Sequence, residues 1–169
     1  MMLHRLDRRD WTKAVGIGVA VSVLTAAFMV ATMKAGVSPL PKSLGLAFAE
    51  ALLRRPLPLP VGLLFHTAWT TAFSALYIVL FRDALTLVHA LGLAVALWLF
   101  VLVFFFPFVG WGLFGLAIGP KLIVGAAIPH LLFALFLWAL CVWAFGRVAP
   151  ADTSDASISR PPASATRLR

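Results

Sequence analysis

The side chains of this sequence with the greatest capacity for chemistry are three histidines within long apolar runs. His66 lies near the start of the second of four such runs, and His130 lies about two helical turns into the fourth. Alternate membrane spans enter from the same side, so we expect the two imidazoles to lie at a similar depth. A lipid-facing imidazole would leave polar nitrogens without partners, so both rings are predicted to face the bundle interior. His89 enters the third run from the opposite side and is expected at the membrane interface.

Several uses of His66 and His130 remain open. Each ring could bond a hydroxyl or a carbonyl across the bundle, which is common for polar side chains in membranes. The pair could instead hold a haem as its two axial ligands, or form a proton- or quinone-binding site. A metal site is disfavoured because two histidines without a nearby carboxylate or thiol leave the metal short of ligands. Pro129 cannot donate a helical hydrogen bond to Gly125, which frees an acceptor beside His130 and predicts a kink.

Carboxylates are missing from all four apolar runs. The six acidic residues are Asp7, Asp10, Glu50, Asp83, Asp152 and Asp155. Pumps and cation transporters usually need intramembrane carboxylates, so a carboxylate-driven transporter and an intramembrane aspartyl protease are disfavoured. Ser22 and Ser74 lie in ordinary helical contexts rather than on the glycine-flanked turn of a serine protease, and Cys141 is the single cysteine. The sequence therefore predicts a protein that is not an enzyme, with no catalytic residue, metal site or resident cofactor.

The composition places these residues in a membrane protein. Of 169 residues, 62% are hydrophobic and 12% are charged, against roughly 45–50% and about 25% in soluble domains. The mean hydropathy is +1.01, so most of the surface must face something other than water. A net charge of +8 could suggest nucleic acid, but the basic residues flank apolar runs instead of forming a patch with exposed aromatic residues. The predicted partner is the lipid bilayer, and nucleic acid is not expected.

Four apolar runs are long enough to cross a bilayer, which takes about 20 residues of helix. They cover Ala14–Met33, Val61–Phe81, Ala84–Phe108 and Leu122–Phe145. The predicted organisation is a basic cytoplasmic N-terminal segment (1–13), a transmembrane domain (14–147) and a disordered C-terminal tail (148–169) rich in serine, alanine, threonine and proline. The lysines and arginines in short flanks number six on one side and five on the other, which favours N- and C-termini in the cytoplasm.

Two connections are more than simple loops. Between Pro41 and Arg55, apolar residues recur at helical spacing, which predicts an amphipathic helix lying in the membrane interface. Val109–Pro120 is rich in glycine and could be a re-entrant segment or a tightly packed helix end. The predicted fold is therefore all-α, an integral membrane bundle of four transmembrane helices with an interfacial amphipathic helix between the first and the second.

Small residues at regular spacing predict close helix packing. One set recurs every fourth residue in the first run, and the other would share one side of the glycine-rich segment if that segment were helical. The sets are Ala14, Gly18, Ser22 and Ala26, and Gly112, Gly115 and Gly119. They favour a non-enzymatic accessory or scaffold subunit that forms a homo- or hetero-oligomer through these faces. The alternative is a small transporter or channel-like protein for a neutral or apolar solute, which a faint similarity between the two halves of the chain would suit.

Four sequence motifs together resemble a group of bacterial inner-membrane proteins. They are SVLTAAFMVATMKAGVSPLP (22–41), LLFHTAWTTAFSALY (63–77), FFPFVGWGLFGLAIGPK (105–121) and IPHLLFALFLWAL (128–140). The chain is similar there to the YagU-like proteins and related domains of unknown function, which pair a first helix bearing threonine and methionine with histidines near the starts of the second and fourth helices. The resemblance covers Val15–Arg147 and implies a four-helix protein of the bacterial inner membrane. Val30 stands where the group often has an acidic residue, which argues against a metal or cation role.

Overall fold

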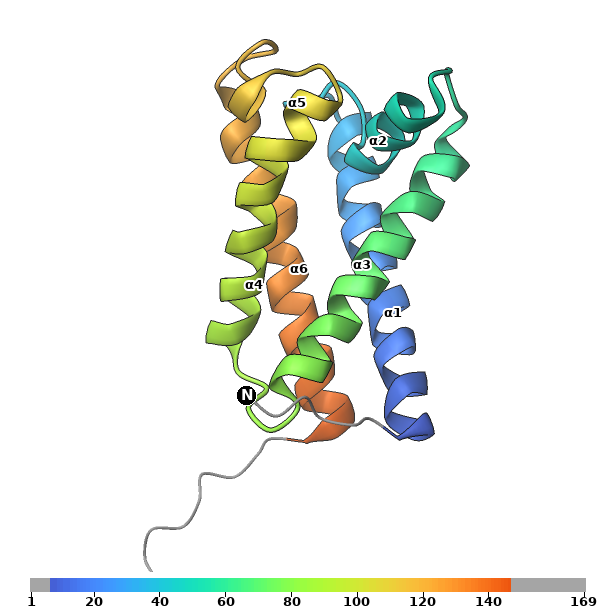
Figure 1. Ribbon diagram of the computed structural model, residues 1–169, viewed down its shortest axis with the longest axis vertical. Helices are drawn as coiled ribbons and strands as arrows, with labels where there is room; N and C mark the ends of the chain where they lie inside the picture. The colour runs from blue at the N-terminus through green and yellow to red at the C-terminus, as the bar shows by residue number, and fades with distance from the viewer. Residues whose placement is uncertain (1–6, 147–169) are drawn as a thin grey trace, which may run out of the picture.

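The computed structural model describes residues 7–146, and every regular element in that range is helical. Four helical stretches are long and apolar enough to cross a membrane. They are α1 (Arg8–Lys34), α3 (Leu59–Phe81), the stretch Leu87–Phe108 that begins with α4 (Leu87–Phe100), and α6 (Lys121–Phe145). All four predicted runs therefore form helices, and together they make an elongated bundle (Figure 1). The predicted disordered tail and Arg147 lie outside the described residues.

Helix α1 begins earlier than its apolar run. The side chain of Asp7 accepts a hydrogen bond of 2.7 Å from the backbone N–H of Asp10, so it caps the helix and satisfies a donor of the first turn. The cap starts the helix at Arg8, six residues before Ala14. Residues 8–13 therefore belong to α1, which continues without a break into the predicted first span.

The bundle is built from two helix pairs. Helix α1 packs mainly on α3, and α4 packs mainly on α6, while α1 and α6 join the pairs. Helices α3 and α4 have little direct contact although they follow one another in the chain, and in Figure 1 they diverge toward the end that carries α2. Two buried apolar clusters fill the bundle. The lower cluster surrounds Tyr77 and Leu137, and the upper cluster surrounds Phe106 and Leu122.

Polar contacts cross the bundle at the end where α1 begins and α6 ends. The ammonium of Lys13 donates a 3.0 Å hydrogen bond to the carbonyl of Ala144, which satisfies one of the last acceptors of α6. The guanidinium of Arg82 lies 4.3 Å from the ring centroid of Phe145 and 3.8 Å from the carboxylate of Asp10. These contacts connect α1, the end of α3 and the end of α6.

The segment Pro41–Arg55 contains a helix, α2 (Leu44–Leu53), which is shorter than the predicted one. Its buried residues are Gly45, Ala47 and Ala49. A Cβ atom on Gly45 would lie only 2.3 Å from the carbonyl oxygen of Gly62, so the backbones of α2 and α3 touch at two glycines. Helix α2 therefore packs tightly against the bundle, and Leu44 and Phe48 also contact it, whereas Leu52 is exposed.

An ion pair holds the segment around α2. The Lys42 ammonium lies 2.5 Å from one carboxylate oxygen of Glu50, and the backbone N–H of Leu57 donates a 3.2 Å hydrogen bond to the other. The bond from Lys42, followed by the bond from Leu57, lowers the pKa of the Glu50 carboxyl below its ordinary value. The carboxylate thereby connects both ends of the α2 segment, and this contact is present in the ionised form above the lowered pKa.

The glycine-rich segment 109–120 is not a helix with a glycine face. Gly112 and Gly115 have φ angles of +76°, which side chains with a Cβ rarely adopt, and the only regular turn there is the 3-10 helix η2 (Leu113–Gly115). Gly119 also has a positive φ, of +150°. The three glycines instead take part in a compact turn between α5 (Phe106–Phe108) and α6, in which Gly115 packs against Phe106 and Leu122.

A change of helical register in the third span was not predicted from the sequence. Helix α4 continues into the π-helix η1 (Val101–Phe105), in which the N–H of Phe106 bonds the carbonyl of Val101. Pro107 follows directly and has no N–H to donate to Val103, so the regular ladder is interrupted here in any case. Short π-helical segments occur frequently at functional sites, and this one borders a cavity.

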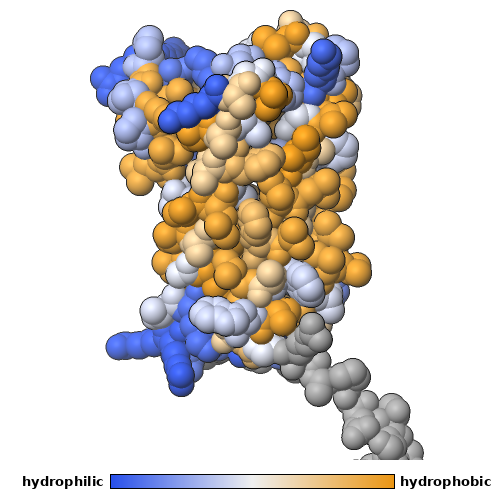
Figure 2. All heavy atoms as spheres, turned by 180° about the vertical axis from the view of Figure 1, so that it is seen from behind, coloured by the Kyte–Doolittle hydropathy of each residue, from blue (hydrophilic) through white to orange (hydrophobic). Residues whose placement is uncertain are grey.

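Hydrophobic and hydrophilic side chains of the described residues are distributed over the surface as expected for a protein in a bilayer. Figure 2 shows a broad band of hydrophobic residues around the middle of the bundle, with hydrophilic residues gathered at both ends. Large apolar side chains such as Val23, Leu64 and Leu131 are exposed within the spans. In a water-soluble bundle such side chains would face the core, so their exposure agrees with a lipid-facing surface.

Candidate functional site

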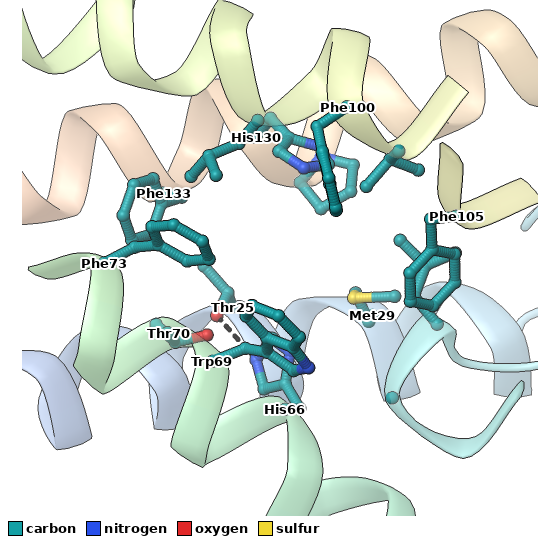
Figure 3. Close-up of a pocket in the computed structure, with 15 residues that line it drawn as sticks. Thr25, Met29, His66, Trp69, Thr70, Phe73, Phe100, Phe105, His130 and Phe133 are labelled. Atoms are coloured by element: carbon teal, nitrogen blue, oxygen red, sulfur yellow. Dashed lines mark hydrogen bonds between the residues drawn. The ribbon is translucent and has the colours of Figure 1, made fainter. Parts of the chain in front are cut away.

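A half-open cavity of about 130 Å³ lies between the helices of the bundle, and residues of both apolar clusters line it. All four spans and α2 contribute to its wall, which is mostly apolar. Its polar members are Thr25 of α1, His66 and Thr70 of α3, and His130 of α6. The structure therefore brings His66 and His130 to one interior site, with the two rings on opposite walls (Figure 3).

His130 lies on the α6 wall beside Pro129. Its ring Nδ1 lies 2.6 Å from the carbonyl oxygen of Ala126, one turn earlier in the same helix. A carbonyl can only accept, so Nδ1 carries the hydrogen, and in the neutral ring Nε2 is an acceptor. Helix α6 runs from Lys121 to Phe145 through Pro129. The ring bonds Ala126, and the carbonyl that Pro129 was predicted to free, that of Gly125, is not its partner.

His66 is held by α1 from the other wall. Its Nε2 lies 3.1 Å from Oγ1 of Thr25, and Thr25 donates its hydroxyl hydrogen to the carbonyl of Val21 at 2.8 Å. The single hydroxyl hydrogen is used by Val21, so the hydroxyl oxygen accepts from Nε2–H of His66. The remaining nitrogen of the neutral ring, Nδ1, is therefore an acceptor.

Polar and small residues form a continuous seam between α1 and α3 beside the cavity. Ser22 and Thr67 share a 2.8 Å hydrogen bond, and a Cβ on Gly18 would lie 2.6 Å from the Cα of Thr71. Ala14, Gly18 and Ser22 are buried, and Ala26 is half-buried. The predicted small-residue stripe therefore packs within the chain, where it brings Thr25 within reach of His66.

Aromatic rings make much of the remaining wall. Trp69 and Phe73 are stacked with their ring centroids 5.5 Å apart, and Phe48 of α2 packs on Phe65, Trp69 and Phe105 at centroid distances of 5.5–5.8 Å. Ring pairs at such distances contribute beyond their buried area. The aromatic cluster joins α2, α3 and the π-helix across the top of the cavity, and Figure 3 shows Phe105 and Trp69 around it.

The other sequence-predicted residues lie apart from this site. His89 is near the start of α4, where its Nδ1 lies 2.8 Å from the carbonyl of Ala84 and its ring stacks on Phe81. Gly112, Gly115 and Gly119 lie in the turn before α6 and do not line the cavity. Sequence reasoning expected a hydroxyl or carbonyl partner for His66 but did not identify Thr25. The signal was available, since Thr25 follows Ser22 by one turn on the same face of the first helix.

The geometry weighs against the haem alternative. The Nε2 of His66 is engaged by Thr25, although this nitrogen would have to face an iron shared with Nε2 of His130. A cavity of about 130 Å³ is close to the engineered cavity of about 150 Å³ that holds one benzene, and a porphyrin is several times larger. No group of three histidine, cysteine or acidic side chains that could hold a metal occurs among residues 7–146.

Comparison with protein-family models, with curated proteins and with solved structures gives no match to this chain. The functional argument therefore rests on the cavity and on the residues that line it.

Proposed function

We propose that this chain is an integral membrane protein that binds a small, neutral and mostly apolar molecule taken from the bilayer. The observation that supports this proposal best is the cavity itself, which has an aromatic wall and two histidines inside an otherwise apolar bundle. Ligand sites are typically concave and apolar with a few polar groups that orient the ligand. Polar side chains within a membrane are energetically costly, so they rarely face lipid and often mark functional sites.

The volume and shape of the site favour binding over passage. About 130 Å³ accommodates a single six-membered ring. The lower apolar cluster, which contains Phe133, Leu137 and Tyr77, fills the bundle between the cavity and the opposite end. A continuous path across the protein, as a channel-like protein would need, would have to open through this cluster.

The accessory-subunit hypothesis depended on two small-residue faces. The first is occupied by α3 of the same chain, through Gly18 and Ser22, and the second is a non-helical turn. Neither offers a ready helix face to another protein. The cavity therefore supports a binding function more directly than it supports a scaffold.

Filling the cavity tests the proposal. We expect 4-fluorotoluene to bind the purified protein in nanodiscs, measured by ¹⁹F NMR against nanodiscs without protein. Leu97 lines the cavity, whereas Leu99 of the same helix is 47% exposed on the outer surface. Leu97→Trp should weaken binding at least about tenfold because the indole occupies the ring site, and Leu99→Trp should leave binding unchanged. Equal binding by both variants would show that the probe dissolves elsewhere.

We further propose that the chain lies in a bacterial inner membrane with both termini in the cytoplasm and with α2 near the outer interface. Lys34 ends α1 and Ala84 follows α3, and both are exposed at opposite ends of the bundle (Figure 1). In intact cells of a Cys141→Ala background, Lys34→Cys should react with an impermeant maleimide and Ala84→Cys should react only after lysis. Labelling of both from one side would contradict four spans, and the reverse pattern would contradict the orientation.

A further inference from the structure

We infer that the ligand of this cavity carries a hydroxyl group that donates to Nε2 of His130. The inference rests on the proposed binding function and adds the chemistry of the ligand's polar group. It selects phenols, ring alcohols or the reduced, dihydroxy form of a quinone over ketones, aldehydes and the oxidised quinone.

The first step is the unused nitrogen of His130. Its Nδ1 is 2.6 Å from the carbonyl of Ala126, which makes that nitrogen the donor and leaves Nε2 as an acceptor. Within residues 7–146 no side chain or backbone group bonds Nε2. The ring lines the cavity between Phe100 and Phe133 (Figure 3). A polar nitrogen that faces a mostly apolar cavity wall is stabilised by a partner, and here that partner must be a donor.

The second step is that His66 supplies no donor to the ligand. Its Nε2–H is engaged by Thr25, whose own hydrogen is used by the carbonyl of Val21. The other nitrogen of the neutral ring can only accept. Both histidines of the cavity therefore have acceptor nitrogens left, and a carbonyl group on a ligand would find no histidine N–H to bond.

The third step is Thr70. Its side chain is 8% exposed, lines the cavity and makes no hydrogen bond within residues 7–146. Figure 3 shows its oxygen on the same wall as Thr25 and His66. A threonine hydroxyl can donate as well as accept, so it supplies the donor that the histidines lack. A ligand hydroxyl can donate to His130, whereas a ligand carbonyl could accept only from Thr70, on the opposite wall.

The size of the cavity determines how large the apolar part of the ligand can be. One ring fills about 130 Å³, and the wall that surrounds it is formed by Met29, Trp69, Phe73 and Phe105. These side chains make dispersion contacts with an aromatic or saturated ring but supply no charge for an ionised group. The ligand is therefore a neutral ring of about six atoms with one hydroxyl in contact with protein.

Four probes of one size separate this inference from the proposed function. They are 4-fluorophenol, 4-fluorobenzaldehyde, 4-fluoroanisole and 4-fluorotoluene, measured by ¹⁹F NMR in nanodiscs and corrected for partition into nanodiscs without protein. One neutral hydrogen bond to His130 leads us to expect the phenol to bind about fivefold more tightly than the toluene. The aldehyde and the anisole cannot donate to His130 and can accept only from Thr70, so both should bind more weakly than the phenol.

Matched variants assign the effect to the two partners. His130→Phe keeps a ring on the wall and should abolish the preference for the phenol while the toluene still binds. Thr70→Val keeps the side-chain shape and should remove any gain of the aldehyde over the toluene while the preference for the phenol remains. His89→Phe, outside the cavity, should change neither. The comparison among the four probes on the unaltered protein stands even if a variant fails to fold.

The outcomes are distinguishable. Tighter binding of the phenol that depends on His130 supports the inference. Equal binding of all four probes, or tighter binding of the aldehyde than of the phenol, overturns the inference and leaves the proposed function intact. If no probe binds above nanodiscs without protein, the proposed function fails, and the inference fails with it.

Discussion

Replacement of Gly18 by alanine is expected to destabilise the protein by about 1–3 kcal/mol, the range for overpacking in a well-packed core. The added methyl would lie 2.6 Å from the Cα of Thr71 and 3.0 Å from its Cγ2. The nearest atom belongs to the backbone of α3, so it cannot rotate away as a flexible side chain would. The seam between α1 and α3 would have to widen, which weakens the Ser22–Thr67 and Thr25–His66 hydrogen bonds as well.

Gly16 provides the matched control two residues earlier in the same helix. A Cβ there would meet no atom within 4 Å. Gly16→Ala should be neutral or stabilise the helix by up to about 1 kcal/mol, since alanine has the higher helix propensity. Unfolding by increasing mole fraction of SDS, followed by tryptophan fluorescence, measures both variants. Equal stability of the Gly18 and Gly16 variants would contradict the close packing of α1 on α3.

Gly45→Ala should separate α2 from the bundle and abolish binding of the ring probe. The new methyl would lie 2.3 Å from the carbonyl oxygen of Gly62, a distance that no side-chain rotation can relieve. Gly45 and Leu44 line the cavity, and Phe48 holds the aromatic cluster one turn later. A shift of α2 therefore removes part of the wall. We expect a loss of about 2–3 kcal/mol in unfolding free energy and loss of 4-fluorotoluene binding.

Gly62→Ala tests the same contact from the other side. Its methyl would lie 2.6–2.8 Å from the Cβ, Cα and N of Leu46, so it should have a similar effect. The two changes act on one contact, so the double variant should lose less than the sum of the single losses. Gly92→Ala in α4, where no atom lies within 4 Å of a built Cβ, is the control. Retained probe binding in both Gly45→Ala and Gly62→Ala would show that α2 does not form the wall.

The four spans could be predicted because apolar length alone determines them. The predicted run Val61–Phe81 corresponds to the helix Leu59–Phe81, and the predicted run Leu122–Phe145 corresponds to the helix Lys121–Phe145. The start of α1 was missed because Asp7 caps the helix through a side chain, so the helix extends beyond the apolar residues. Helix ends depend on such local hydrogen bonds, whereas apolar periodicity reports only the buried or lipid-facing middle.

The partners of the helix faces could not be predicted. Spacing every fourth residue identified Gly18 and Ser22 as packing residues but could not say whether the partner was α3 or another protein. The glycines at 112, 115 and 119 were assigned to a helix face, whereas their positive φ angles make turns. Glycine serves both purposes, and only the backbone conformation distinguishes them.

For the candidate site, the sequence identified the two histidines but not their surroundings. The alternation of spans predicted that His66 and His130 would share a depth, and they line one cavity. The cavity wall depends on α2 and on the π-helix at Val101–Phe105, which arise from tertiary contacts and from the interrupted ladder near Pro107. Neither has a periodic signal in the sequence.

The polar contacts across the bundle lie at one end, so the helices are held together more firmly there than at the other end. Lys13, Arg82 and Phe145 hold α1, α3 and α6 together at the cytoplasmic end of the proposed topology, whereas the cavity lies toward the other end, where α3 and α4 diverge. Bending of one helix pair relative to the other is therefore expected to be smallest near Lys13 and largest at the end where α3 and α4 have little contact. If the cavity binds a ring as proposed, the ring is expected to enter from the lipid at that end.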